Sequence, residues 1–210
     1  MSRRARKSER AAAERRARRR SFLAVVAVVV AVLVIAAAAF ALLAGGSDLD
    51  TEAAPVENYP YPVQMFPPDP GERGHFAVGE TYDDYNSNPP TSGPHTNVAA
   101  GPGVYEEPVP KETAVHSMEH GMVVVWYNCN GGPQPLNEAA CGTLRQDLAA
   151  IVNAANENGK KVLMTPYAAM DRRIALTAWQ FLDSFDEFDA QRVRTFIETF
   201  YCHINLEGFC

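Results

Sequence analysis

Residues 22–44 constrain this chain most, because they form an uninterrupted run of 23 residues without a charged side chain. At about 1.5 Å per residue, a helix of this length extends roughly 34 Å, enough to cross a hydrocarbon layer of about 30 Å. A cleaved signal peptide is the alternative, but its apolar region normally spans only about 7–15 residues. We therefore expect residues 22–44 to be a transmembrane helix that contacts the lipid bilayer.

Charge is divided between the two sides of this run. Residues 1–21 carry ten basic and two acidic side chains, whereas the residues after 44 carry nine basic and 23 acidic ones. Because basic segments remain in the cytoplasm, the N-terminus is expected inside the cell and everything after the run outside it. The net charge of −6 is thus an average over two opposite populations, and the acidic part excludes nucleic acid as its partner.

Beyond the anchor, the sequence predicts a spacer and one domain. Residues 45–70 contain six prolines and several acids, which favours an extended linker. Residues 71–210 are expected to form a single extracytoplasmic domain. Its elements are a strand over 122–127, a helix over 144–155, strands over 161–165 and 174–181, and a helix over 193–200 capped by Asp189. This β-α-β-β-α order predicts an α+β or α/β fold, a mixed sheet with helices packed on it and a parallel first crossover.

All four cysteines follow the apolar run, and an even count in an exported domain favours disulfides. Four cysteines allow three pairings, of which Cys129–Cys141 with Cys202–Cys210 is the most local in sequence. No C-x-x-C motif is present, so a thioredoxin-type redox site is not expected.

Histidines are the main candidates for chemistry, because four of the five lie within 46 residues. His116 and His120 belong to an H-x-x-E-H string with Glu119, a spacing that on a helix places both imidazoles on one face. The same string occurs in inverzincin proteases. Prolines shortly before it and a β-branched run directly after it favour a short turn leading into a strand instead.

Two further features bear on a metal site. His95 ends a segment rich in proline and glycine, residues 88–95, which is expected to hold this imidazole on a rigid loop. Met118 and Met122 flank the histidine pair, and thioether with imidazole favours copper, whereas three imidazoles with water suit zinc. Core packing is the ordinary role of such methionines, and hydrogen bonding to loop carbonyls is the ordinary role of such histidines.

Three segments together, residues 88–95, 115–127 and 164–179, resemble the DUF3105 family of bacterial proteins, which are common in actinobacteria and often membrane-anchored. The resemblance covers roughly residues 71–200. It supplies no activity, but it implies that five residues match positions of the family's motifs: His75, His95, His116, Glu119 and His120. The final residues depart from the family by carrying two cysteines, which leaves His203 without a supported role.

Three hypotheses follow. We favour a membrane-tethered extracytoplasmic protein that binds copper, or less readily zinc, through clustered histidines, and that handles or delivers the ion. Its expected ligands are His75, His95, His116 and His120, with Glu119, Met118 and Met122 as further ligands or their partners. The second hypothesis is a zinc-dependent hydrolase with Glu119 as general base. The third is a structural or interaction module of the cell envelope, in which the histidines serve only packing.

Overall fold

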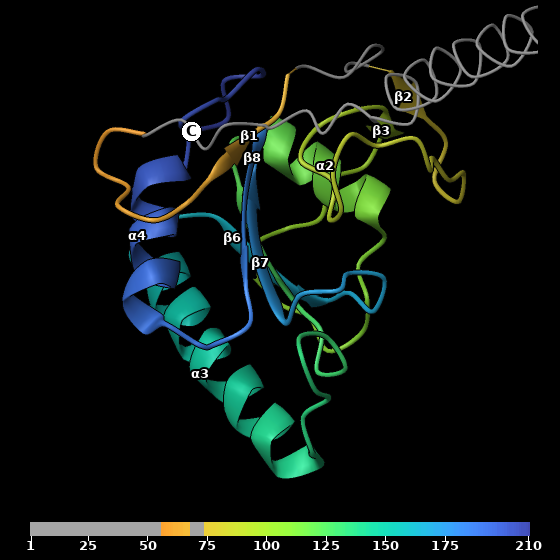
Figure 1. Ribbon diagram of the computed structural model, residues 1–210. Helices are drawn as coiled ribbons and strands as arrows, with labels where there is room; N and C mark the ends of the chain where they lie inside the picture. The colour runs from red at the N-terminus through yellow and green to blue at the C-terminus, as the bar shows by residue number, and fades with distance from the viewer. Residues whose placement is uncertain (1–55, 68–73) are drawn as a thin grey trace, which may run out of the picture. The chain divides into compact units, whose positions relative to one another are not determined.

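The computed structural model describes residues 56–67 and 74–210 (Figure 1). The predicted cytoplasmic segment 1–21, the transmembrane helix 22–44 and much of the linker 45–70 lie outside the described residues. Within the part that is described, no helix combines the length and the apolar character that a membrane span needs.

The domain is built on a six-stranded mixed sheet, with the strand order β1-β8-β7-β5-β6-β4. Strand β6 pairs in parallel with both β4 and β5. Strand β7 pairs antiparallel with β5 and with β8, and β1 pairs antiparallel with β8. The parallel β5–β6 pair confirms the predicted parallel crossover. The strands are β1 Gln64–Met65, β4 Gly103–Val104, β5 Val123–Tyr127, β6 Val162–Pro166, β7 Ile174–Ala178 and β8 Phe181–Phe185.

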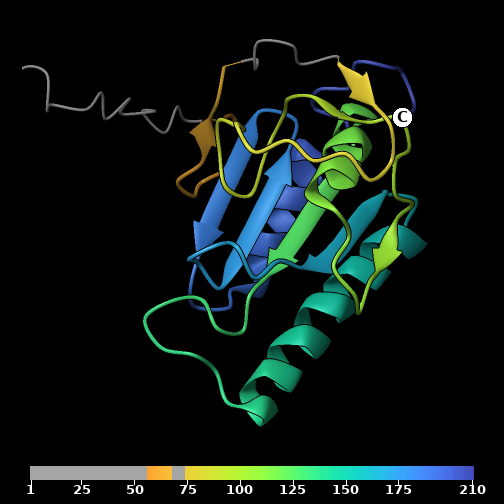
Figure 2. The same ribbon diagram turned by 90° about the vertical axis from the view of Figure 1, so that its right-hand side faces the viewer.

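Helices cover both faces of the sheet, which gives an α+β domain (Figure 2). Helices α3 Glu138–Glu157 and α4 Ala190–Phe200 pack on one face, and the shorter helix α2 Lys111–Glu119 packs on the other. Successive side chains of β5 point to opposite faces of the sheet. Val123 and Val125 belong to the apolar cluster under α3 and α4, whereas Val124 and Trp126 belong to the cluster under α2. A strand buried on both faces reads as a continuous apolar run, as this one does.

The predicted single strand over 174–181 is wrong, because the chain turns back at Trp179 and Gln180 and continues as β8. Gln180 adopts a φ of 69°, which closes the tight connection. Strand β8 contains Asp183, a residue that disfavours a strand prediction. Its carboxylate is nevertheless buried, and it accepts hydrogen bonds from Tyr59 and Arg192.

The expectation that H-x-x-E-H lies on a short turn is also wrong, because His116 and Glu119 belong to helix α2. The preceding proline does not shorten this helix. Pro110 is its N-cap, with an extended ψ of 133°, so the helix begins immediately after the ring. Gly121 ends the segment with a φ of 82°, a conformation that side chains rarely adopt.

Both disulfides have the sequence-local pairing. Cys129–Cys141 joins the loop after β5 to the start of α3, and Cys202–Cys210 closes the tail after α4. The predicted cap of α4 is confirmed as well, since the carboxylate of Asp189 accepts hydrogen bonds from the backbone amides of Gln191 and Arg192.

The ion-paired carboxylate of Asp186, directly after β8, is expected to make the stability of the domain decrease in acid. Burial acts to raise the pKa of Asp186, but hydrogen bonds from Arg172 Nη1 (2.6 Å) and the Arg173 backbone amide (3.1 Å) outweigh it and lower the pKa below its usual value. A carboxyl with a lowered folded-state pKa stabilises the fold above its unfolded pKa of about 4, and this contribution disappears as the pH falls through the folded value.

Asp186→Asn is therefore expected to lower the free energy of unfolding by about 1 kcal/mol at pH 7 and to flatten its decline below pH 4, as urea unfolding at a series of pH values would measure. Glu187→Gln is the matched control, because this neighbouring carboxylate is 96% exposed. An unchanged acid profile in Asp186→Asn would contradict the prediction.

Candidate metal centre

The candidate site lies where helix α2 meets a small two-stranded sheet. Strands β2 His75–Phe76 and β3 His95–Thr96 run parallel, with His75 and His95 in register. The backbone amide of His95 donates to the Gly74 carbonyl at 2.9 Å. This pairing brings together two histidines that are 20 residues apart in sequence.

The loop that carries His95 is attached to the body of the domain at several points. The Asn88 side chain donates to the Ala169 carbonyl at 2.7 Å, and the Thr91 carbonyl accepts from the Gln180 amide at 3.1 Å. Gly93 adopts a φ of 125°, a conformation that favours glycine, and its carbonyl then accepts a hydrogen bond from His95 Nδ1 at 2.7 Å. The loop thus fixes the orientation of the imidazole as well as its position.

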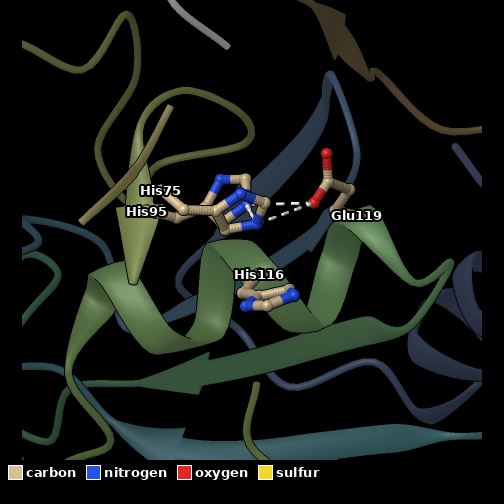
Figure 3. Close-up of side chains that lie close together, drawn as sticks. All are labelled: His75, His95, His116 and Glu119. Carbon is tan, nitrogen blue, oxygen red and sulfur yellow. Dashed lines mark hydrogen bonds and ion pairs between the residues drawn. The ribbon is translucent and has the colours of Figure 1, made fainter. Parts of the chain in front are cut away.

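Four side chains converge at this place, and we call them the inner group: His75, His95, His116 and Glu119 (Figure 3). Each offers one ligand atom, and these atoms all lie within 4.8 Å of one another. His95 Nε2 lies 3.0 Å from His75 Nε2 and 3.0 Å from Glu119 Oε2. His116 and Glu119 are three residues apart on α2, so the helix presents both to the same neighbours.

Hydrogen bonding determines where the lone pairs of two imidazoles lie. A carbonyl oxygen only accepts, so His95 Nδ1 donates to Gly93, and His116 Nδ1 donates to the Thr96 carbonyl at 2.7 Å. In a neutral ring the other nitrogen, Nε2, then carries the lone pair. This is the usual arrangement of metal-bound histidines, whose second nitrogen donates to a carbonyl or carboxylate.

The contact between His95 and Glu119 follows from this tautomer. With neutral His95, the lone pair of Nε2 faces a carboxylate oxygen 3.0 Å away, and two acceptors at that distance repel each other. Both side chains are buried, with residue exposures of 0% and 2%, so water does not screen the contact. A positive charge at this point, either a second proton on the ring or a bound metal ion, would turn the contact into an attraction, and His75 Nε2 lies 3.0 Å from the same nitrogen.

Burial also favours the neutral form of the His116 imidazole. Desolvation lowers the pKa of His116 below its ordinary value, although the hydrogen bond to the Thr96 carbonyl opposes this effect. A lowered pKa keeps the ring neutral near pH 7, and a neutral imidazole is the form that binds metal. His75 is the accessible member of the inner group, with 37% of its side chain exposed.

The remaining predicted residues lie elsewhere. His120 does not join the inner group, because its imidazole meets His116 and Glu207 instead. Met118 and Met122 are buried in the apolar cluster under α2 together with Trp126, so packing accounts for their position. His203 contacts the rings of Phe181 and Phe200.

Sequence reasoning gave Glu119 a choice of roles and missed Glu207. A general base needs a carboxylate that is free to take a proton from water, whereas the Glu119 carboxylate contacts His95 directly, which favours a ligand role. Glu207 lies 87 residues after His120 in the tail closed by Cys202 and Cys210. The disulfide spacing was the one signal that could have drawn attention to it.

The fold and the site define a disulfide-bonded α+β domain with a histidine–carboxylate group that could hold a metal ion. A family model described as "Protein of unknown function (DUF3105)" matches residues 79–205, and the chain belongs to this family. The assignment predicted from the three sequence segments is thereby confirmed. His75 precedes the matched range, and Glu207 and Cys210 follow it. No curated protein and no solved structure matches the chain.

Proposed function

We propose that this protein is a membrane-anchored, extracytoplasmic metal-binding protein that holds one transition-metal ion in the inner group and serves metal handling or delivery. The observation that carries the proposal is the convergence of three imidazoles and one carboxylate whose ligand atoms all lie within 4.8 Å of one another, with His95 and Glu119 buried at the centre. The hydrogen bonds that His95 Nδ1 and His116 Nδ1 donate to carbonyls add to it, because they leave Nε2 as the nitrogen of each neutral ring that can bind an ion.

The donor set bears on which ion is bound. Three imidazoles and a carboxylate suit Zn²⁺, and imidazole also suits Cu²⁺. Copper(I) prefers thioethers, but Met118 and Met122 pack in the apolar cluster, so the preference for copper that rested on these methionines loses its support. We therefore propose a divalent ion, with zinc ahead of copper.

Location outside the cytoplasm is part of the proposal. The uncharged run over residues 22–44 and the basic segment before it support an anchor with the domain on the outer side. Two disulfides support the same location, because such bonds persist in oxidising compartments.

The proposal is tested by the metal content of the purified full-length protein. We expect about one zinc or copper ion per chain by mass spectrometry, and less than about a tenth of that in His95→Gln, because this ring is buried at the centre of the inner group.

His203→Gln is the matched control, since this histidine contacts phenylalanine rings and not the inner group. Thermal unfolding of each variant shows whether the domain is folded. Equal metal content in the folded His95→Gln variant and the wild type would overturn the proposal.

A further inference from the structure

A second set of ligands adjoins the inner group, and we call it the outer group: His116, His120 and Glu207. Its three ligand atoms also lie within 4.8 Å of one another. Two imidazoles and one carboxylate form a known ligand set for zinc sites that keep an open coordination position. The outer group is more accessible than the centre of the inner group, with side-chain exposures of 20% for His120 and 37% for Glu207.

The charged neighbour of His120 Nε2 is the Glu207 carboxylate. This nitrogen lies 2.6 Å from Glu207 Oε2, close enough for an ion pair, but the two atoms do not have the geometry of a hydrogen bond. Among the described residues no other hydrogen-bond partner satisfies this buried nitrogen. Metal–ligand bonds of about 2 Å place two ligands of one ion roughly 3 Å apart, so an ion bound here would take the imidazole and the carboxylate as ligands after a small separation of the pair.

The tail that carries Glu207 is held against the end of α2. The Cys202 amide donates to the Gly121 carbonyl at 2.9 Å, and the Leu206 amide donates to the Glu119 carbonyl at 3.2 Å. Gly121 permits this approach, because a β-carbon there would lie 2.6 Å from Cys210 Sγ. The ring of Phe209 lies against the His120 imidazole, with 4.1 Å between centroids. The position of Glu207 beside His120 is therefore built into the fold.

His116 belongs to both groups, and this determines how they can be used. Its Nδ1 donates to Thr96, so the neutral ring has a single lone pair for an ion. One lone pair cannot serve two ions at once. The two groups are thus alternative positions for a single ion that keeps His116 as a ligand in both.

We infer that the outer group is a second, weaker metal position through which an ion enters or leaves the inner group by exchange of ligands around His116. The inference rests on the proposed function, because the inner group must bind an ion for such an exchange to occur. Exchange through a shared ligand avoids a fully hydrated intermediate. It would therefore speed release of an ion that buried ligands otherwise hold.

The test uses Co²⁺ as the probe with the full-length protein in detergent solution, because the absorption of Co²⁺ reports its ligands. Wild-type protein is expected to bind one Co²⁺ per chain. Glu207→Gln is expected to keep equilibrium affinity within about threefold and to slow the release of Co²⁺ to excess EDTA at least about fivefold. Glu198→Gln, a 66% exposed carboxylate paired with Lys160, is the matched control and should release the ion at the wild-type rate.

A double variant separates this inference from the proposed function. His95→Gln is expected to bind Co²⁺ at least about 100-fold more weakly, with a spectrum different from that of the wild type. Adding Glu207→Gln should weaken the residual binding at least a further tenfold.

If the double variant binds as His95→Gln does, or if Glu207→Gln releases Co²⁺ at the wild-type rate, the outer position is overturned while the inner group stands. If His95→Gln alone binds with wild-type affinity, the inner group itself fails. Circular dichroism of each variant checks folding, which the isosteric change at the exposed Glu207 is expected to leave intact.

Discussion

Glu119→Gln is expected to change apo stability and metal affinity in opposite directions. With neutral His95 in the apo protein, the glutamine amide would donate a hydrogen bond to His95 Nε2, whereas the native carboxylate oxygen at 3.0 Å would face the lone pair of that nitrogen. We expect the apo variant to gain about 1 kcal/mol in free energy of unfolding. Zinc affinity should fall more than about 100-fold, because loss of even a ligand's hydrogen-bond partner costs about 10- to 100-fold.

Two measurements check this prediction, urea unfolding in the presence of EDTA and zinc competition with a chromophoric chelator. Glu112→Gln is the matched control, since this carboxylate is also buried on α2 but lies outside the inner group. If His95 were doubly protonated and paired with Glu119 as an ion pair, the glutamine would lower apo stability. A destabilised apo variant would therefore contradict the proposed lone-pair contact.

Asp183→Ala is expected to be the most destabilising single change away from the site. The Asp183 side chain is 1% exposed, and it accepts hydrogen bonds from Tyr59 and from Arg192, whose Nε lies 2.7 Å away. Burial and the neighbouring Asp183 raise the pKa of the Tyr59 phenol, so the hydroxyl keeps its proton as a donor. Removing the carboxylate leaves a largely buried guanidinium unpaired, which costs about 3–5 kcal/mol.

Urea unfolding followed by tryptophan fluorescence measures this loss. Ser184→Ala, on the same strand, should change stability by less than about 1 kcal/mol. Replacing both partners, as in Asp183→Leu with Arg192→Met, should restore much of the loss, because no charge is then left unpaired. A double variant as unstable as Asp183→Ala would mean that packing, and not the unpaired charge, causes the effect.

The regular elements of the fold could be predicted because their patterns are local. The continuous apolar run of β5 and the apolar spacing of α3 and α4 are each visible within one segment. Strand β8 could not be predicted, because Asp183 is tolerated there only through partners at Tyr59 and in α4, which are distant in sequence.

The candidate site was predictable in part for the same reason. Three of its histidines stood out by their clustering and by the rigid loop before His95. The orientation of the His120 side chain could not be predicted, because it depends on the C-terminal tail. The Cys202–Cys210 disulfide closes this tail, which packs against Gly121. Helix α2 could not be predicted because little room remains between Pro110 and Gly121, and the nine-residue helix uses nearly all of it by beginning directly after the proline.

The two apolar clusters share no residue with the inner group: neither contains His75, His95, His116 or Glu119. His116 and Glu119 lie on α2, His75 and His95 lie on β2 and β3, and the His95 ring also contacts Trp179 of the cluster under α2. The exposed ligand His75 is therefore the one at which a donor atom, and with it the preferred ion, could be exchanged with the least disturbance of the scaffold.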